Sequence, residues 1–149
     1  KEGTSMYVTF CGHRNVDHPE QVAQWLHQVV TALIEEGNEQ FYLGGYGEFD
    51  QMGAREVRFQ KQRYPQVRSI LVTPYLSRKI PAGLYDETVY PPLETVPPKL
   101  AILRRNQWMV EHAETVVAYV LYDWGGAAAA LQYAEKKKKR ILRYPLLIP

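Results

Sequence analysis

Phe41-Tyr-Leu-Gly-Gly-Tyr-Gly-Glu-Phe-Asp-Gln-Met-Gly-Ala-Arg-Glu56 is the stretch that decides the fold. A short apolar run stops at Gly44-Gly45, and a helix-compatible pattern follows Gly47. Glycine has no Cβ, and a helix N-terminus offers unpaired N–H groups and a partial positive charge. The order strand, glycine turn, helix therefore predicts a place where a phosphate can approach the backbone, although many such turns hold no ligand.

Two further junctions carry unusual residues where apolar runs end. Cys11-Gly-His-Arg14 follows the first apolar run, and Trp124-Gly-Gly126 follows a later one. Ligands of parallel α/β sheets bind at the carboxyl ends of the strands, which share one edge. We therefore expect these two junctions and the Gly44–Gly47 turn to surround a single site.

Apolar runs alternate with helical periods along the rest of the chain. Strands are predicted at 6–11, 41–43, 67–73, 114–122 and 141–144, and helices at 49–63, 99–112, 127–139 and between a capping box at 17–20 and Gly37. The alternation predicts an α/β fold with a doubly wound, mainly parallel sheet and helices on both faces.

Composition narrows the functional classes. A chain of 149 residues with 46% hydrophobic content can fold as one domain with a real core. The net charge of +2 is too small to favour nucleic acid or a membrane surface as partner. The basic run 136–140 is better explained as the end of a helix, where cations suit the dipole. The four histidines lack the spacing of a metal site, so neither a metal nor another cofactor is predicted.

Two segments and the single cysteine have a residue content that bears on the domain and its location. Residues 1–5 read as an expression remnant, which leaves 6–149 as one domain. Cys11 is the sole cysteine, so a reducing, cytoplasmic location is expected, and the thiol is expected to serve in packing. The segment 74–98 holds six of the ten prolines, and we expect either a surface excursion packed by its own tyrosines or a lid or oligomer contact over the site.

Several side chains at the junctions are candidates for ligand contact. Arg14 carries a fork of donors suited to phosphate, or it pairs locally. His13 contacts phosphate or ribose, or it stabilises its turn. Asp50 binds a ribose hydroxyl or a base, or it caps its helix. Trp124 stacks on a base or covers its turn. Arg104 and Arg105 both face water, as arginines on a helix usually do, or one of them turns toward phosphate.

The motifs together resemble the SLOG superfamily of Rossmann-like domains, which includes DNA-processing protein A and the Lonely guy proteins. The resemblance rests on Val8-Thr-Phe-Cys-Gly-His-Arg14, on the glycine turn that ends in Met52-Gly-Ala54, on Arg105-Asn-Gln-Trp-Met109, and on Gly125-Gly126 after an apolar strand. It covers residues 6–144 and implies a nucleotide-type ligand. It also implies a homodimer, and we expect Trp25 and Trp108 to lie on exposed helices.

One departure separates the possible functions. In the phosphoribohydrolases of the superfamily, glutamates follow the paired glycine and help to break the glycosidic bond. Here Ala127-Ala-Ala-Ala130 follows instead, and Glu48, Asp50 or Asp123 would have to substitute.

The sequence therefore predicts a module that binds a nucleotide or a nucleotide-derived ligand such as an ADP-ribose-like molecule. A nucleoside monophosphate phosphoribohydrolase is the alternative, and the near-neutral charge argues against a DNA-binding protein. The expected ligand-binding residues are Gly12, His13, Arg14, Gly44, Gly45, Gly47, Asp50, Arg105, Trp124, Gly125 and Gly126.

Overall fold

A computed structural model describes residues 6–75, 83–93 and 95–146, so the segment 1–5 lies outside the described residues. Its strands are β1 (Tyr7–Gly12), β2 (Gln40–Leu43), β3 (Arg68–Val72), β4 (Glu87–Val89), β5 (Thr115–Tyr119) and β6 (Arg140–Arg143). Its helices are α1 (Pro19–Glu35), α2 (Glu48–Gln60), the short 3₁₀ turn η1 (Pro98–Leu100), α3 (Ala101–Glu111) and α4 (Gly126–Lys136).

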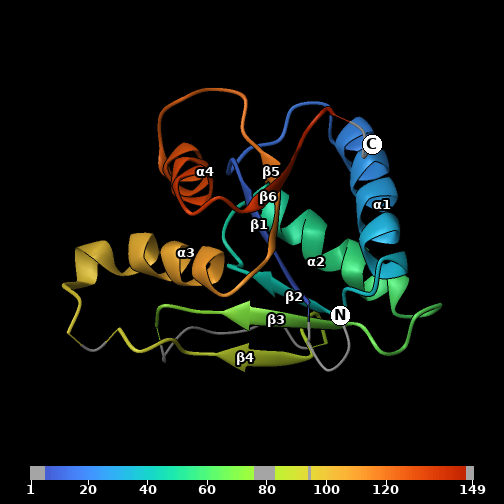
Figure 1. The fold of residues 1–149 in the computed structure, drawn as a ribbon, viewed down its shortest axis with the longest axis horizontal. Coiled ribbons are helices and arrows are strands. Elements are labelled where there is room, and N and C mark those ends of the chain that lie inside the picture. The colour runs from blue at the N-terminus through green and yellow to red at the C-terminus, as the bar shows by residue number, and fades with distance from the viewer. Residues whose placement is uncertain (1–5, 76–82, 94, 147–149) are drawn as a thin grey trace.

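All the strand pairs are parallel, in the order β4-β3-β2-β1-β5-β6. Helices α1 and α2 pack on one face of the sheet and α3 and α4 on the other (Figure 1). The doubly wound Rossmann-like arrangement predicted from the alternation is therefore confirmed. From β1 the chain runs outward through β2 and β3, whereas from β5 it runs to β6 on the opposite side, so the strand order reverses between β1 and β5.

Alternating side chains of the central strands supply both cores. In β1, Val8 and Phe10 pack toward α1 and α2, while Cys11 packs toward α4. In β5, Val117 belongs to the first cluster and Val116 to the second. A strand that helices cover on both faces buries the side chains of both faces. This explains why the sequence of β5 is a nearly continuous apolar run.

The structure corrects four local expectations. Strand β5 ends at Tyr119, so residues 120–122 lie beyond the strand rather than in it. The capping box at 17–20 does not form, because His18 is the N-cap of α1 and makes no side-chain cap. Trp25 is 4% exposed and donates from Nε1 to the Leu146 carbonyl at 2.8 Å, so it does not lie on an exposed surface.

The fourth correction concerns the proline-rich segment 74–98. It contains β4, a parallel edge strand beside β3 that the prolines concealed in the sequence. Tyr85 packs against the main core and Leu93 is buried, so part of the segment belongs to the fold. Residues 76–82 and 94 of the segment lie outside the described residues.

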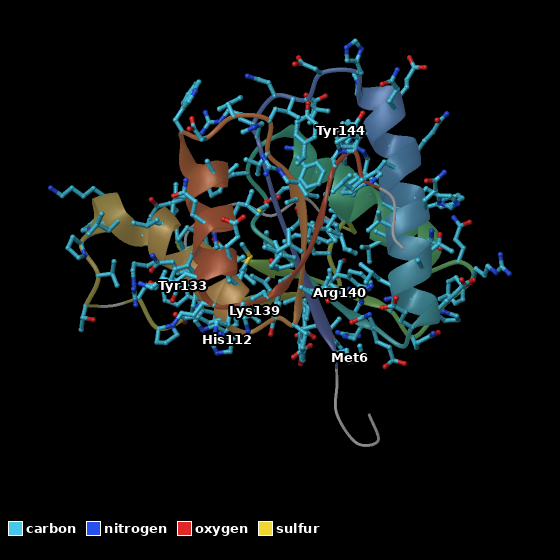
Figure 2. All side chains as sticks on the ribbon, turned by 45° about the horizontal axis from the view of Figure 1, so that its top comes forward. Met6, His112, Tyr133, Lys139, Arg140 and Tyr144 are labelled. Atoms are coloured by element: carbon cyan, nitrogen blue, oxygen red, sulfur yellow. The ribbon has the colours of Figure 1, made fainter. Side chains whose placement is uncertain are left out.

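Different residues lie at the two ends of the sheet. Figure 2 shows Met6, Lys139 and Arg140 at the end where strands begin, and Tyr144, which follows β6, at the other. The basic run therefore closes α4 at the end away from the strand carboxyl termini, as the helix-dipole argument predicts. Within the described ranges, every helix is too short or too polar to span a bilayer.

Candidate functional site

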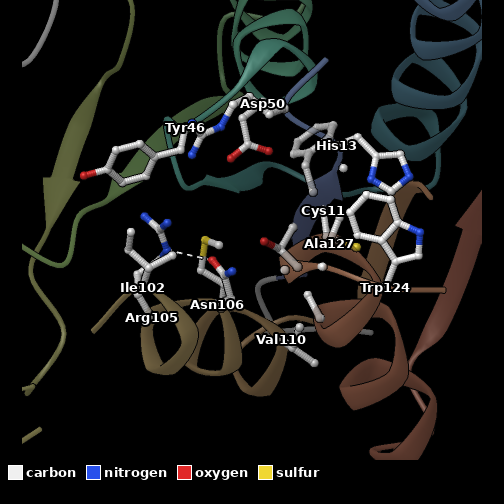
Figure 3. A pocket seen from close by; sticks show the side chains of 18 of the residues that line it. Cys11, His13, Tyr46, Asp50, Ile102, Arg105, Asn106, Val110, Trp124 and Ala127 are labelled. Carbon is white, nitrogen blue, oxygen red and sulfur yellow. Dashed lines mark hydrogen bonds between the residues drawn. The ribbon is translucent and has the colours of Figure 1, made fainter. Parts of the chain in front are cut away.

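A pocket of about 260 Å³ opens at the carboxyl ends of β1 and β5, where the strand order reverses. Such switch points are where open α/β sheets bind ligands. Its walls come from the end of β1, from α2 with the turn before it, from α3, and from the β5–α4 turn (Figure 3). The lining residues are Thr9, Phe10, Cys11, Gly12, His13, Arg14, Tyr46, Asp50, Ile102, Arg105, Asn106, Met109, Val110, Tyr122, Trp124, Gly125, Gly126, Ala127 and Ala130.

The β5–α4 turn is open toward this pocket. Gly125 is the N-cap of α4, and no side chain caps the helix there. Its φ of 91° and ψ of 179° belong to a region that is essentially restricted to glycine. A Cβ built on Gly125 or on Gly126 would meet no atom within 4 Å. The start of α4 therefore has open space beside its glycines and lies at the pocket, and a helix N-terminus in such a place can bind an anion.

The β2–α2 turn is occupied by the protein's own groups. The Gly44 N–H donates to Asp50 Oδ2 at 3.0 Å, and the backbone N–H groups of Gly45 and Tyr46 also bond to this carboxyl. Asp50 is 8% exposed, and burial raises its pKa from 3.8 to about 6, although Arg105 and the three N–H groups act in the opposite direction. An internal carboxylate thus takes the position that a phosphate would need at this turn.

Arg105 ties this turn to the rest of the sheet. Its side chain is buried, and Nη1 donates to the carbonyl oxygens of Gly44 and Val72, both at 2.8 Å. A Cβ on Gly44 would lie 3.0 Å from both Arg105 Cζ and Asp50 Oδ2. The guanidinium also lies 5.2 Å from the centre of the Tyr46 ring. Arg105 therefore positions the turn, since its charge is compensated by groups of the protein itself.

Asn106 follows Arg105 on α3 and reaches into the pocket. Arg105 Nε donates to Asn106 Oδ1 at 2.8 Å (Figure 3, dashed line). Asp50 points into the same space from the opposite wall (Figure 3). Asn106 was not among the expected residues, and its only sequence signal was an amide next to Arg105.

An aromatic stack forms the wall on the side of the β5–α4 turn. The rings of His13 and Tyr122 lie 3.8 Å apart and nearly parallel, and Trp124 stacks on Tyr122 at 4.3 Å. His13 Nε2 accepts from the Leu121 N–H at 2.8 Å, which places the ring proton on Nδ1. Burial, and then the nearby Arg143, lower the pKa of His13, so the ring is neutral at pH 7. The stack fixes the turn and leaves Trp124 68% exposed at the rim.

The floor of the pocket contains Cys11 at the end of β1. The thiol is buried among the side chains of α4, in agreement with a packing role. Burial raises the pKa of Cys11 to about 12, with a smaller contribution from Asp50 in the same direction. A thiol of this pKa stays protonated at pH 7, so Cys11 is not a nucleophile.

Arg14 and Gly47 hold the first two junctions against each other. Gly47 has φ 86°, and a Cβ there would lie 2.8 Å from the Arg14 Cα. The Glu48 N–H donates to the Arg14 carbonyl at 2.7 Å, and Glu48 Oε1 accepts from the Val16 N–H at 2.9 Å. The backbone of Arg14 is thus fixed, while its exposed side chain lies at the pocket rim.

Most of the expected residues meet in one place. Gly12, His13, Arg14, Asp50, Arg105, Trp124, Gly125 and Gly126 line the pocket, whereas Gly44, Gly45 and Gly47 do not. These three glycines belong to the β2–α2 turn. Tyr46, in the same turn, does line the pocket. Of the three carboxylates considered as substitutes for the missing glutamate, only Asp50 lines the pocket.

Comparisons with known proteins identify the fold. No family model and no curated protein matches the sequence. DNA processing protein A of Streptococcus pneumoniae is similar in structure, with a TM-score of 0.70 and 18% identity over 97% of this chain and 52% of that one. The same protein of Helicobacter pylori, described with a single-stranded DNA binding mode, gives a TM-score of 0.66 and 18% identity over 97% of this chain and 67% of that one.

A third similar structure is the molybdenum cofactor binding protein of Rippkaea orientalis, with a TM-score of 0.66 and 14% identity over 95% of this chain and 77% of that one. Pneumococcal DNA processing protein A is the longer protein, and this chain spans about half of its length. At these identities the likeness concerns the fold alone. The chain shares the doubly wound, Rossmann-like fold of these proteins, in agreement with the fold that the sequence predicts.

Proposed function

We propose that this protein binds a nucleotide, with the phosphate at the N-terminus of α4 and the sugar and base extending across the pocket. The observation that carries the proposal is the open glycine turn Gly125-Gly126, which faces a pocket at the switch point of the sheet. Backbone N–H groups and the helix dipole favour an anion there without any basic side chain. Arg14 at the rim supplies a cation for the same phosphate.

The size of the pocket supports a mononucleotide over a dinucleotide. Its volume is about 260 Å³, slightly below the range of about 300–1,000 Å³ typical of drug-sized ligands. A nucleoside monophosphate is of this size, whereas ADP-ribose carries an additional ribose phosphate that would extend beyond the rim. The ADP-ribose-like ligand is therefore the less favoured form of the proposal.

The similar structures are compatible with this proposal but do not select the ligand. One of them binds a molybdenum cofactor and another single-stranded DNA. Both proteins bind their ligands with this fold, which supports a binding role for this chain. A nucleic-acid partner for this chain would have to overcome a net charge of only +2.

The test is a binding measurement with a variant that affects only the proposed phosphate position. Gly126→Asp adds a carboxylate at the first residue of α4, where no atom would clash and where the helix dipole favours a negative charge. We expect an unchanged or higher melting temperature without ligand, and at least a tenfold loss of affinity for nucleoside monophosphates by calorimetry.

Gln21→Asp provides the matched control, because it adds the same charge to the exposed first turn of α1, outside the pocket. It should leave nucleotide affinity unchanged. Absence of binding by the unmodified protein to AMP, GMP, IMP, CMP and UMP would overturn the proposal. Equal affinity of Gly126→Asp and the unmodified protein would remove the phosphate from α4.

A phosphoribohydrolase activity is the second candidate, favoured by one observation. Asp50 is a buried carboxyl at the pocket with a pKa of about 6, which is in the range of a general acid or base. Three backbone N–H groups already bond to it, and Ala127 and Ala130 line the wall where the hydrolytic relatives carry glutamate. We therefore expect no efficient release of base from nucleoside monophosphates, as measured by chromatography of base and ribose 5-phosphate.

Turnover near one per second, an ordinary rate for an enzyme, would establish the hydrolase instead. Asp50→Asn would then abolish it.

A homodimer and a cytoplasmic location are parts of the proposal that rest on the resemblance and on the single cysteine. The burial of Trp25 removes one of the aromatic residues that supported an interface. Leu100, Ile102 and Leu103 on η1 and α3 are each 40% exposed and form an apolar surface that an interface would cover. A dimeric mass by light scattering at micromolar protein is the expected result, and a monomeric mass contradicts it.

A further inference from the structure

The amide of Asn106 has only one orientation that is compatible with its neighbour. Arg105 Nε can donate a hydrogen bond but cannot accept one, so the atom at 2.8 Å from it must be the amide oxygen Oδ1. Arg105 is itself fixed by the Gly44 and Val72 carbonyls, both at 2.8 Å. The orientation of Asn106 is thus set by a buried group that has little freedom to move.

The other end of the amide faces the pocket. Among the residues that the structure describes, no acceptor bonds to Asn106 Nδ2, and this atom is not among the buried polar atoms without a partner. Nδ2 therefore presents its two N–H donors to the cavity, while Oδ1 is turned toward Arg105. An asparagine that is free to use both ends pairs with adenine through one donor and one acceptor. Asn106 offers the cavity donors alone.

The position of Asn106 determines which part of a nucleotide it meets. Ala127, in the first turn of α4, lies across the pocket from Asn106 and Arg105 on α3 (Figure 3). Phosphate and base lie at opposite ends of the ribose, so a phosphate at α4 directs the base toward α3. Asp50, on the wall opposite Asn106, supplies oxygen acceptors for a ring N–H of the base.

We infer that Asn106 is the specificity-determining residue of the pocket and that it selects a base with an exocyclic oxo group, such as hypoxanthine, guanine or uracil, over its amino counterpart. The inference rests on the proposed nucleotide binding at this site. An oxo group accepts from Nδ2, whereas the amino group of adenine or cytosine would bring a donor against a donor. The ring N–H beside the oxo group faces the Asp50 carboxyl.

Matched pairs of ligands test the inference, because IMP and AMP, or UMP and CMP, differ at this edge of the base. By calorimetry on the unmodified protein we expect IMP to bind roughly tenfold more tightly than AMP, and UMP more tightly than CMP. Asn106→Asp keeps an oxygen for Arg105 Nε but replaces the donors by an acceptor. The preference should then reverse in favour of AMP.

Gln107→Ala is the control, since Gln107 is the next residue of α3, is not among the residues that line the pocket, and accepts from Arg104. It should retain the preference for IMP. Asn106→Ala, checked for folding by its thermal melt, should bring the ratio close to one.

Equal binding of IMP and AMP by the unmodified protein would overturn this inference and leave nucleotide binding intact. An unchanged preference for IMP in a folded Asn106→Asp variant would assign the selectivity to another residue. Failure of all monophosphates to bind would instead overturn the proposed function itself.

Discussion

The β2–α2 turn and the β5–α4 turn have similar sequences and opposite environments. Both join a buried parallel strand to a helix through paired glycines, Gly44-Gly45 in the first and Gly125-Gly126 in the second. Around the first, a Cβ would meet Asp50 and Arg105 at 3.0 Å, whereas around the second it would meet nothing within 4 Å. Similar local sequences thus produce one turn filled by the protein and one turn left open.

The difference shows that the partners of the N–H groups decide whether a glycine turn can bind a ligand. In the first turn the anion is internal, because Asp50 accepts from Gly44, Gly45 and Tyr46. In the second turn no side chain caps α4. The first is therefore a structural element that shapes the pocket wall, and the second is the better candidate for ligand contact.

The largest expected effect comes from removing Arg105, the buried cation that bonds to the β2–α2 turn. We call this turn, which the protein's own groups fill, the closed turn. Arg105→Met would leave the Gly44 and Val72 carbonyls without their donor and Asp50 without its neighbouring charge. Each buried group that loses its partner typically costs about 1–3 kcal/mol, so we expect a loss of about 3–5 kcal/mol in the free energy of unfolding. Urea denaturation followed by circular dichroism measures it.

Arg104→Met is the matched control, since Arg104 is exposed on the same helix and donates to the side chain of Gln107, its neighbour on the helix surface. Its effect should stay within about 0.5 kcal/mol, as for an ordinary surface substitution. If both variants had the same stability, Arg105 would not hold the closed turn, and its role would move to ligand contact.

The second effect compares alanine at the two turns. Gly47→Ala combines a backbone conformation that disfavours side chains with an overlap at 2.8 Å from the Arg14 Cα, so we expect a loss of about 3 kcal/mol. Gly125→Ala has a similar conformation, with φ 91°, but no overlap, so we expect about 1–2 kcal/mol. Equal losses in thermal or urea melts would mean that the two turns are equally free.

The sequence predicts the fold better than it predicts the roles of single residues. Alternating apolar runs and helical periods specify the parallel sheet, and strand ends follow from where the glycines lie. The edge strand β4 escaped prediction because it has only three residues and lies among prolines, and its pairing with β3 depends on tertiary context. The sequence also brought eight of the expected residues to one pocket, since the carboxyl ends of parallel strands share an edge.

What sequence could not supply is the direction in which polar groups face. Nothing in the order of residues indicates that the Asp50 carboxyl turns back to the β2–α2 turn, or that Arg105 bonds to main-chain carbonyls. The Arg105 contacts join segments 33 and 61 residues apart along the chain, whereas the Asp50 contact with Gly44 spans six residues and depends on how the turn folds back. The same holds for Asn106, whose orientation follows only from the position of the Arg105 guanidinium.

The third prediction concerns how the contribution of Asp50 to the free energy of unfolding changes with pH. Because burial raises the pKa of Asp50 from 3.8 to about 6, the folded protein binds more protons than the unfolded chain between these values. The contribution of Asp50 to stability is therefore fully present below about pH 4, is lost as the pH rises to about 6, and is constant above. The loss is on the order of 2–3 kcal/mol.

Asp50→Asn isolates this contribution, because an amide does not titrate. Glu36 and Asp86, whose pKa values are lowered, change stability in the opposite direction at lower pH and are common to both proteins. The difference in unfolding free energy between the unmodified protein and Asp50→Asn should thus shift in favour of the variant from pH 4 to pH 6. A constant difference across this range would show that Asp50 is ionised freely and is not enclosed by the turn.

The smallest expected effect concerns Cys11, which lies on the pocket floor between the two turns. Its thiol is buried against α4 and stays protonated, because burial raises its pKa to about 12. Cys11→Ala removes only the sulfur atom, so we expect a loss of about 1 kcal/mol and a nucleotide affinity within about twofold of the unmodified protein. Reaction of native Cys11 with a thiol reagent at pH 8 should be far slower than in urea, since the thiolate is the reactive form. Rapid labelling of the folded protein would mean that water and reagent reach Cys11 through the cluster that it shares with Val110 and Ala130, and the packing role of the thiol would then be wrong.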